Sequence, residues 1–337
     1  MKHKILVTIG PGSLNGEVIR KMNKENIYLY RINMSHTRCE DLKGVITEIQ
    51  KHTNVPICID SEGAQVRSGK INNGSSEFVK GATIKINYSE ILGDNEKISF
   101  TPADVVPRLQ VDDIINIDFD SVSFKVKEIN DRHVIATVIN GGLVGCNKAA
   151  DVSRQMDLPA ITTKDRKAII IGKEMGIKHF ALSFANQQEN VDEMRSLVGP
   201  NAEIISKIES KSGLRNLYGI IDSSDAILID RGDLSREVDL ILIPFLQRRI
   251  ISIARSKETP VFVATNLLES MIKNKNPTRA EVNDVVSSVE HGANGLVLAA
   301  ETAIGKFPVE SVRNIRRLMN QLDRWTPNTS INELLDI

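Results

Sequence analysis

The sequence predicts an α/β protein in which a (β/α)₈ barrel, or TIM barrel, carries a small inserted all-β domain. Segments typical of strands and helices alternate at both ends of the chain. Between them, residues 70–157 contain only short β-rich runs separated by turn residues. Three predicted strands precede this insertion and five follow it, which gives the eight strands of a closed barrel. An open doubly wound sheet is the alternative, but the sequence lacks the glycine-rich fingerprint of its dinucleotide site.

The predicted barrel domain consists of residues 1–69 and 158–325, and residues 326–337 form a short polar tail. Its first part is predicted to contain, in order, the strand Lys4–Ile9, the helix Asn15–Asn26, the strand Ile27–Met34, the helix Glu40–His52 and the strand Val55–Asp60. In the inserted domain, β-rich runs over Ile114–Phe119, Val122–Ile129 and His133–Ile139 precede the turn Asn140–Gly142. No long amphipathic helix interrupts these runs, which favours an all-β fold for the insertion.

The alternation resumes after the insertion. Apolar residues at helical spacing predict a helix over Thr163–Gly176. The five later strands are predicted at His179–Phe184, Glu203–Ile208, Ala226–Ile229, Val261–Thr265 and Gly295–Ala299. Between and after them, helices are predicted at Leu240–Ala254, Arg279–His291 and Val309–Leu322.

The composition argues against several classes of function. Lysine plus arginine and aspartate plus glutamate both number 43, so the net charge gives no reason to expect nucleic acid or a membrane surface as a partner. Three cysteines without paired spacing suggest neither a disulfide framework nor a zinc site. The sequence shows no signal peptide and no apolar segment of membrane-spanning length. We therefore expect a cytoplasmic protein.

A lysine and a glutamate stand out in the predicted strand around Ile205. Lys207 and Glu209 are two residues apart, so their side chains leave an extended chain on the same face. Opposite charges on an otherwise apolar strand are costly unless they pair with each other or meet a ligand. Two interpretations are open on this evidence alone: a structural ion pair at a strand end, or part of a functional site.

Polar residues also follow the other predicted strands, at the carboxyl ends where barrels of this type carry their chemistry. They are Arg31, Asn33 and Ser35; Asp60 and Ser61; Asp230 and Asp233; Thr265; and Glu301 and Thr302. Each alone has an ordinary structural explanation, such as a turn residue or a helix N-cap. Together with Lys207 and Glu209 they make six clusters at the same end of one barrel, which are harder to explain as a solvated rim.

The residue types indicate the chemistry. Glu209 and Asp233 are carboxylates without a neighbouring cysteine or histidine, which favours Mg²⁺ or Mn²⁺ over zinc. Arg31 and Lys207 would supply positive charge to a phosphoryl group in transfer. The backbone N–H groups around Gly232 could hold a carboxylate. A monovalent cation could lie among the oxygen-bearing side chains of Asn33, Ser35, Asp60 and Ser61.

The chain resembles the pyruvate kinase family. The segments that carry the resemblance are Val7–Pro11, Arg31–His36, Asp60–Gly69, Asn140–Gly142, Leu158–Asp165, Ser206–Glu209, Asp230–Leu234, Ala264–Met271, Pro277–Val282 and Ala299–Ala303. They follow the family's order with near-family spacing from about residue 3 to residue 322.

The resemblance implies an activity and a set of site residues. It implies transfer of the phosphoryl group of phosphoenolpyruvate to ADP, giving pyruvate and ATP, with Mg²⁺ or Mn²⁺ and with K⁺ as a further cofactor. The implied catalytic residues are Arg31, Lys207 and Thr265; the substrate-binding residues are Gly232, Asp233 and Thr265; the nucleotide-binding residues are His36, Arg67 and Lys164; the divalent-metal ligands are Glu209 and Asp233; and the K⁺ ligands are Asn33, Ser35, Asp60 and Ser61. The inserted domain would be the family's mobile lid, and the barrel would be the element through which a homo-oligomer forms.

The chain also departs from the family pattern. Glu62 stands where the family has a lysine, and Gln65 stands where it has a glutamate associated with K⁺ dependence. Ser235 and Arg236 replace a glycine and an aliphatic residue. The family's C-terminal regulatory domain has no counterpart in the sequence, so we expect a minimal or divergent member.

Three functions are consistent with these residues. The first is pyruvate kinase activity itself, favoured by Arg31, Lys207, Glu209, Asp233 and Thr265. The second is a specialised biosynthetic paralogue that uses metal-bound phosphoenolpyruvate or a 2-keto acid with a different acceptor or reaction, favoured by Glu62 and Gln65. The third is a non-catalytic scaffold or sensor, which the retained polar set argues against.

Overall fold

The computed structural model describes residues 3–118, 121–154, 156 and 158–335 of the chain. The chain forms two compact units. The first consists of Met1–Gly63 together with Ala160–Ile337, and the second of Ala64–Pro159. The predicted last residue of the inserted domain, Asp157, lies outside the described residues, as does Phe119 at the end of one predicted strand.

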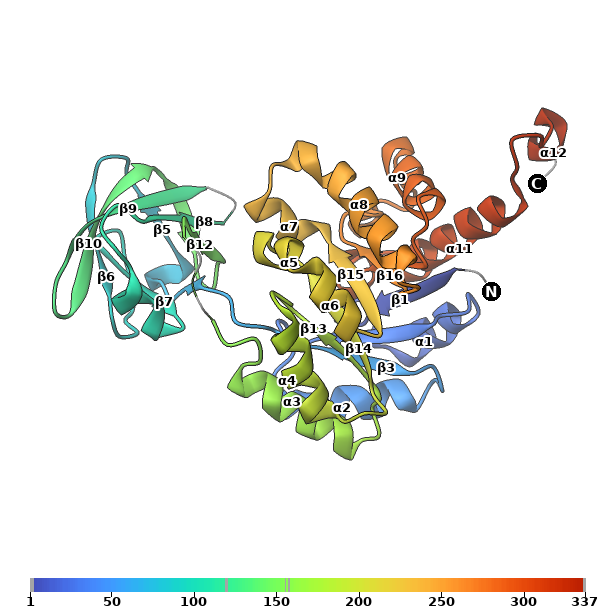
Figure 1. Ribbon diagram of the computed structural model, residues 1–337, viewed down its shortest axis with the longest axis horizontal. Helices are drawn as coiled ribbons and strands as arrows, with labels where there is room; N and C mark the ends of the chain where they lie inside the picture. The colour runs from blue at the N-terminus through green and yellow to red at the C-terminus, as the bar shows by residue number, and fades with distance from the viewer. Residues whose placement is uncertain (1–2, 119–120, 155, 157, 336–337) are drawn as a thin grey trace. The chain divides into compact units, whose positions relative to one another are not determined.

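The first unit is a closed barrel of eight parallel strands, which confirms the predicted fold class (Figure 1). Around the barrel the strands follow the order β1, β17, β16, β15, β14, β13, β3 and β2. Their bounds are β1 Lys4–Thr8, β2 Leu29–Asn33, β3 Ile57–Asp60, β13 His179–Leu182, β14 Glu203–Ile208, β15 Ala226–Asp230, β16 Val261–Ala264 and β17 Gly295–Leu298. The numbering jumps from β3 to β13 because the strands of the second unit intervene in the sequence.

Helices connect the strands and surround the barrel (Figure 1). The α-helices of this unit are α1 Gly16–Asn23, α2 Cys39–Gln50, α3 Thr163–Glu174, α4 Gln188–Val198, α5 Lys211–Arg215, α6 Leu217–Ser223, α7 Arg231–Glu237, α8 Ile243–Ser256, α9 Arg279–Glu290, α10 Ala300–Ala303, α11 Pro308–Arg324 and α12 Ile331–Leu335. Two 3₁₀ helices, η3 Leu240–Leu242 and η4 Glu269–Ile272, accompany them. Among the described residues, no helix is both long and apolar enough to cross a membrane.

The alternation of side chains along the strands separates two apolar cores in the barrel unit. In β1, Ile5 and Val7 belong to the larger core, whereas Leu6 belongs to the smaller one. The smaller core fills the barrel with one or two side chains from each strand, among them Leu29, Cys58, Ala181, Ile205 and Leu228. The residue two positions after each of these five faces the same way at the carboxyl end of its strand.

The second unit, Ala64–Pro159, has its own apolar core, which includes Phe78 and Phe124 in edge-to-face contact. A seven-stranded sheet has the order β12, β8, β9, β10, β6, β7 and β4, and β11 pairs with β5. The elements are β4 Arg67–Ser68, η1 Asn72–Gly74, β5 Ser75–Phe78, β6 Thr83–Asn87, β7 Lys97–Thr101, η2 Ala103–Arg108, β8 Ile114–Ile117, β9 Val122–Ile129, β10 His133–Asn140, β11 Gly142–Gly145 and β12 Ala150–Val152.

Some predicted bounds were wrong, and a short helix in the tail was not predicted. The helix predicted from Leu240 begins as η3, and the α-helix starts at Ile243, where Pro244 fits the first turn because its missing N–H has no partner there anyway. Thr265 does not extend β16, because its φ of 68° places it in the left-handed region. The tail contains α12, which begins after a capping box: Ser330 Oγ accepts from Glu333 N at 3.2 Å, and Glu333 accepts from Ser330 N at 2.7 Å.

A buried carboxylate fixes the segment that follows β3 to the start of α3. Asp165 is 1% exposed and accepts hydrogen bonds from the backbone N–H groups of Glu62 at 2.7 Å, Gly63 at 3.2 Å and Thr162 at 3.0 Å. It also accepts from the Thr162 hydroxyl at 2.7 Å, within the capping box that begins the helix. These contacts fix the chain at both places where it passes between the barrel and the second unit.

We expect Asp165→Ala to lower the free energy of unfolding by about 3 kcal/mol, because it leaves buried N–H donors without an acceptor. Urea denaturation followed by circular dichroism measures the change. The exposed Asp192 of α4 provides the control Asp192→Ala, which should change stability by less than about 0.5 kcal/mol. Equal effects of the two substitutions would contradict the role given to Asp165.

Candidate active site

The inward-facing positions at the carboxyl ends of five strands bring charged and polar side chains together. Two residues after the apolar residues that fill the barrel come Arg31 in β2, Asp60 in β3, Ser183 after β13, Lys207 in β14 and Asp230 in β15. All five are at most 5% exposed. The alternation that fills the barrel with apolar side chains therefore also places this polar layer above them.

Lys207 lies at the centre of the layer. Its Nζ is 2.9 Å from Glu209 Oε1, 3.2 Å from Asp60 Oδ2 and 3.9 Å from Asp230 Oδ2. It also donates a hydrogen bond to Ser183 Oγ at 3.0 Å. The pairing of Lys207 with Glu209 is thus one part of a larger cluster, and neither simple interpretation of the sequence describes it completely.

Arg31 contacts the same oxygen of Asp60, Oδ2, as Lys207 does. Its guanidinium forms an ion pair with Asp60 and donates to Thr8 Oγ1 at 2.9 Å. Asp60 thus pairs with two cations, Arg31 and Lys207, and all three side chains are buried. A buried carboxylate paired with two cations in this way stays ionised and orients both positive groups.

The pKa values follow this arrangement. Burial lowers the pKa of Lys207, but Asp60 and Glu209 together raise it well above its ordinary value. Burial raises the pKa of Asp60, but the combined opposite effect of Arg31 and Lys207 is larger. The pKa of Asp60 therefore lies below its ordinary range. Burial raises the pKa of Glu209 to about 8 against the opposing effect of Lys207, and burial likewise raises the pKa of Asp230. The last two groups need additional positive charge, either a proton or a cation.

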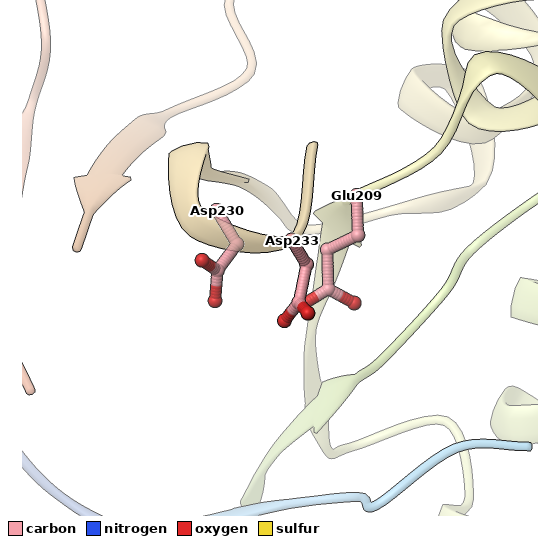
Figure 2. A group of neighbouring side chains, drawn as sticks. All are labelled: Glu209, Asp230 and Asp233. Atoms are coloured by element: carbon pink, nitrogen blue, oxygen red, sulfur yellow. The ribbon is translucent and has the colours of Figure 1, made fainter. Parts of the chain in front are cut away.

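Glu209, Asp230 and Asp233 bring three carboxylates together (Figure 2). One oxygen from each lies within 4.8 Å of the others, and Figure 2 shows the three side chains extending to the same side of the backbone. Glu209 Oε2 accepts from the N–H of Phe184 at 2.7 Å, while Glu209 Oε1 and Asp230 Oδ1 are buried and have no hydrogen-bond partner among the described residues. Hard, partly unsatisfied oxygens fit Mg²⁺ or Mn²⁺.

Glu209 Oε1 takes part in an ion pair without a hydrogen bond. Lys207 Nζ lies 2.9 Å from this oxygen, but the oxygen accepts no hydrogen bond among the described residues. The contact stabilises the charge and leaves a lone pair directed elsewhere. This oxygen therefore remains available to a cation.

Thr265 and Gly232 contact each other directly. The Gly232 N–H donates to Thr265 Oγ1 at 2.8 Å, and the Thr265 hydroxyl donates to the carbonyl oxygen of Ala264 at 2.6 Å. Thr265 and Asn266 have φ values of 68° and 54°, which are uncommon for residues other than glycine. The strained turn after β16 thus directs a hydroxyl towards the first turn of α7.

The four predicted K⁺ ligands are close in the fold, but oxygens of Asn33, Asp60 and Ser61 already have partners. Asn33 is opposite Asp60 in the register of β2 and β3, and its Oδ1 accepts from the N–H of Ser35 at 2.9 Å. Ser61 Oγ accepts from the N–H of Ser183 at 2.9 Å, and the Ser61 carbonyl oxygen accepts from the Ser183 hydroxyl at 2.6 Å. Asp60 belongs to the Lys207 cluster. K⁺ binding here stays a prediction.

The three predicted nucleotide-binding residues fall in both units. Lys164, in α3, lies 3.0 Å from Glu62 Oε2 and donates to the carbonyl oxygen of Met34 at 2.5 Å. His36 is exposed after β2, with its N–H donating to the Asn33 carbonyl oxygen at 3.2 Å. Arg67 belongs to the second unit, where it donates to the Asn147 carbonyl oxygen at 3.1 Å.

Comparison with known proteins identifies the family. Residues 1–312 match the family model of the pyruvate kinase barrel domain. The chain belongs to the pyruvate kinase family. A pyruvate kinase from Clostridium acetobutylicum is 33% identical over 96% of this chain and 70% of its own length, and one from Thermoplasma acidophilum is 36% identical over 96% of this chain and 58% of its own length.

A solved structure agrees with this assignment. The crystal structure of a pyruvate kinase from Cryptosporidium parvum matches with a TM-score of 0.87 and 31% identity, over 97% of this chain and 70% of that one. The chain therefore shares the pyruvate kinase fold throughout its matched length, and it spans between about half and three quarters of the length of the relatives named here.

Two residues of this site received no role from the sequence: Asp230 was named only among the polar residues at strand ends, and Ser183 was not singled out. Ser183 contacts Lys207, and Asp230 completes the group of three carboxylates. A signal existed for Asp230, because it directly follows the predicted strand Ala226–Ile229 and precedes Asp233 by three residues. No signal pointed to Ser183, since its contacts come from β3 and β14, far away in the sequence.

Lys207→Met should destabilise the protein more at high pH than at low pH. The Glu209 carboxyl has an ordinary pKa of 4.5 and a folded-state pKa of about 8, so it favours the fold while protonated and this contribution is lost as the pH rises through 8. Removing the ammonium enlarges that loss. We expect the melting temperature to fall by a few degrees at pH 5 and by about 10 °C at pH 9.

The exposed Lys178 supplies the control Lys178→Met, which should leave the melting temperature unchanged at both pH values. Scanning calorimetry in metal-free buffer measures all three proteins. A pH-independent loss in the Lys207 variant would show that its ammonium does not neutralise these carboxylates.

Proposed function

We propose that the chain transfers the phosphoryl group of phosphoenolpyruvate to ADP, giving pyruvate and ATP. The observation that carries the proposal is the burial of Lys207 between Asp60, Glu209 and Asp230 at the carboxyl end of the barrel. An ammonium fixed this firmly is suited to stabilise the charge of a phosphoryl group in transfer, a reaction that depends on positioning and electrostatics.

The other residues have supporting roles in this proposal. Arg31 adds a second positive group, oriented by Asp60 and Thr8. Glu209 and Asp233 hold Mg²⁺ or Mn²⁺, which neutralises charge on the phosphoryl oxygens when bound. Thr265 and the Gly232 backbone position the carboxylate end of the substrate, near the site where the enolate is protonated. His36 and Lys164 of the barrel unit contact the nucleotide, and K⁺ lies near Asn33, Ser35, Asp60 and Ser61. The same nucleotide-binding role for Arg67 of the second unit stays a prediction from the sequence.

A coupled assay tests the activity directly. Pyruvate production from phosphoenolpyruvate is followed with lactate dehydrogenase and NADH, across a panel of nucleoside diphosphates, with Mg²⁺ or Mn²⁺ and with or without K⁺. We expect ADP-dependent turnover that falls by on the order of 10²–10³ in Lys207→Met, because one preorganised donor to the transition state is lost. The control is again Lys178→Met, which should retain activity.

Two outcomes would contradict the proposal. Near-normal turnover in Lys207→Met would make the lysine a structural partner of the carboxylates. Absence of turnover with every diphosphate, in a protein that still binds phosphoenolpyruvate and Mn²⁺, would instead support the specialised paralogue.

One contact favours that second function. Glu62 Oε2 lies 3.0 Å from Lys164 Nζ. The ammonium group that the family resemblance assigns to nucleotide binding is therefore already paired with a carboxylate. Both side chains are partly exposed, at 23% and 32%. The pair lowers the positive charge available to phosphate groups and adds a negative charge beside them. We infer weak ADP binding and an altered preference for the acceptor.

Glu62→Gln should strengthen ADP binding by up to about fivefold, the effect of releasing a partly exposed ion pair worth about 1 kcal/mol or less. Calorimetric titration with ADP measures the dissociation constant, and the coupled assay measures KM. Glu48→Gln is a matched control, since Glu48 also pairs with a lysine, Lys51 at 2.9 Å, on α2. An unchanged ADP affinity would place the nucleotide away from Lys164. Cytoplasmic location and self-association through the barrel remain predictions from the sequence.

A further inference from the structure

We propose that Asp230 is a third carboxylate ligand of the divalent cation, so that the site holds Mg²⁺ or Mn²⁺ before any substrate binds. This inference rests on the proposed metal site at Glu209 and Asp233 and adds a residue to it.

Asp230 lies beside the two proposed metal ligands, Glu209 and Asp233. Asp230 is the last residue of β15 and shares the inward face with Leu228 of the barrel core. Asp233 follows on the first turn of α7, and Glu209 lies just beyond the neighbouring strand β14. The side chains of all three extend to the same side (Figure 2). Two adjacent strand ends and one helical turn thus fix the geometry of the three carboxylates.

The spacing of the oxygens suits one ion. Ligand atoms from the three residues lie within 4.8 Å of one another. In an octahedral Mg²⁺ site with bonds of about 2.1 Å, ligand oxygens are about 3 Å apart when adjacent and about 4.2 Å apart when opposite. Small side-chain rotations therefore bring all three oxygens to one cation.

Asp230 also has a buried oxygen, Oδ1, that makes no hydrogen bond among the described residues. The residue as a whole is 5% exposed. A buried carboxylate oxygen without a partner is costly, so such atoms in folded proteins usually meet a ligand, a water or an ion. Asp230 Oδ1 lies in the group whose other buried unbonded oxygen is Glu209 Oε1.

Charges in the site lead to the same conclusion. The carboxylates are Asp60, Glu209, Asp230 and Asp233, and the cations in contact with them are Arg31, Lys207 and Arg236. Arg31 pairs with Asp60, Arg236 lies 3.3 Å from Asp233, and Lys207 is closer to Asp60 and Glu209 than to Asp230. The site thus carries one excess negative charge, and Asp230 has the most distant cation. A divalent ion supplies the missing positive charge.

The ordinary structural role of an aspartate at this place is absent. Asp230 occupies the N-cap position of α7, where an aspartate usually accepts a hydrogen bond from a backbone N–H of the first turn. Its side chain makes no such bond. The Gly232 N–H instead donates to Thr265 Oγ1. Capping therefore does not explain a buried carboxylate here, and cation binding does.

Mn²⁺ titration of the substrate-free full chain, followed by electron paramagnetic resonance of the free ion, tests the inference. We expect Asp230→Asn, which keeps the size of the side chain, to raise the Mn²⁺ dissociation constant at least about tenfold. Water-proton relaxation provides a second measurement. In the variant the bound Mn²⁺ should gain an inner-sphere water and relax water more strongly, an effect that a purely structural residue would not produce.

Two further variants separate the failures. Asp222→Asn removes a carboxylate that is 56% exposed and pairs with Lys257, and it should bind Mn²⁺ like the wild type. Glu209→Gln should lose Mn²⁺ affinity. Normal Mn²⁺ binding by Asp230→Asn, with loss in Glu209→Gln, would overturn the inference and leave the proposed function intact. Normal Mn²⁺ binding by both variants would show that these carboxylates do not hold the cation, and it would contradict the proposed metal site as well. An absence of Mn²⁺ binding by the substrate-free wild type would also overturn the inference.

Discussion

The burial of Lys207 among carboxylates is the interaction on which the rest of this site depends. A closed barrel excludes water from its interior, so an ammonium there must be neutralised by side chains of neighbouring strands. Asp60 and Glu209 do this from two directions, and Arg31 balances Asp60. Arg31 orients Asp60, and Asp60 and Glu209 orient Lys207. The result is a preorganised positive centre with little freedom to rearrange, which is what stabilisation of a transferring phosphoryl group requires.

The same compact arrangement leaves the site short of one positive charge. Burial raises the pKa values of Glu209 and Asp230 because no protein cation fully matches them. A proton and a metal ion compete for such oxygens, so the free energy of metal binding and the stability of the fold are coupled. Elsewhere in the barrel unit, Glu62 and Lys164 neutralise each other. The chain thus keeps the charges that handle a phosphoryl group and a cation, while one charge assigned to the nucleotide is already paired.

Strained backbone at two strand ends supports the site. Phe184, with a φ of 50°, follows β13 and donates its N–H to Glu209, whereas Thr265, with a φ of 68°, follows β16 and accepts from Gly232. Left-handed conformations cost energy for residues with a side chain, and they persist where surrounding contacts determine them. Here they turn the chain sharply after a strand, so that a donor and a hydroxyl reach Glu209 and Gly232, which lie just beyond the neighbouring strands β14 and β15.

The sequence by itself determined the alternation of strands and helices and the place of the insertion. It also determined that the side chains of Lys207 and Glu209 lie on the same face of the chain. Each of these features depends on neighbours along the chain. The sequence also placed Arg31, Asp233 and Thr265 at strand ends through motifs that retain their order. Only the tertiary structure showed that Lys207 contacts Asp60 and Ser183, that Glu62 pairs with Lys164, and that Asp230 faces Glu209. These contacts depend on the register between strands that are distant in sequence, and on which polar atoms remain unpaired once the barrel closes. Both are properties of the packed barrel, since no local pattern specifies which strand end will face another.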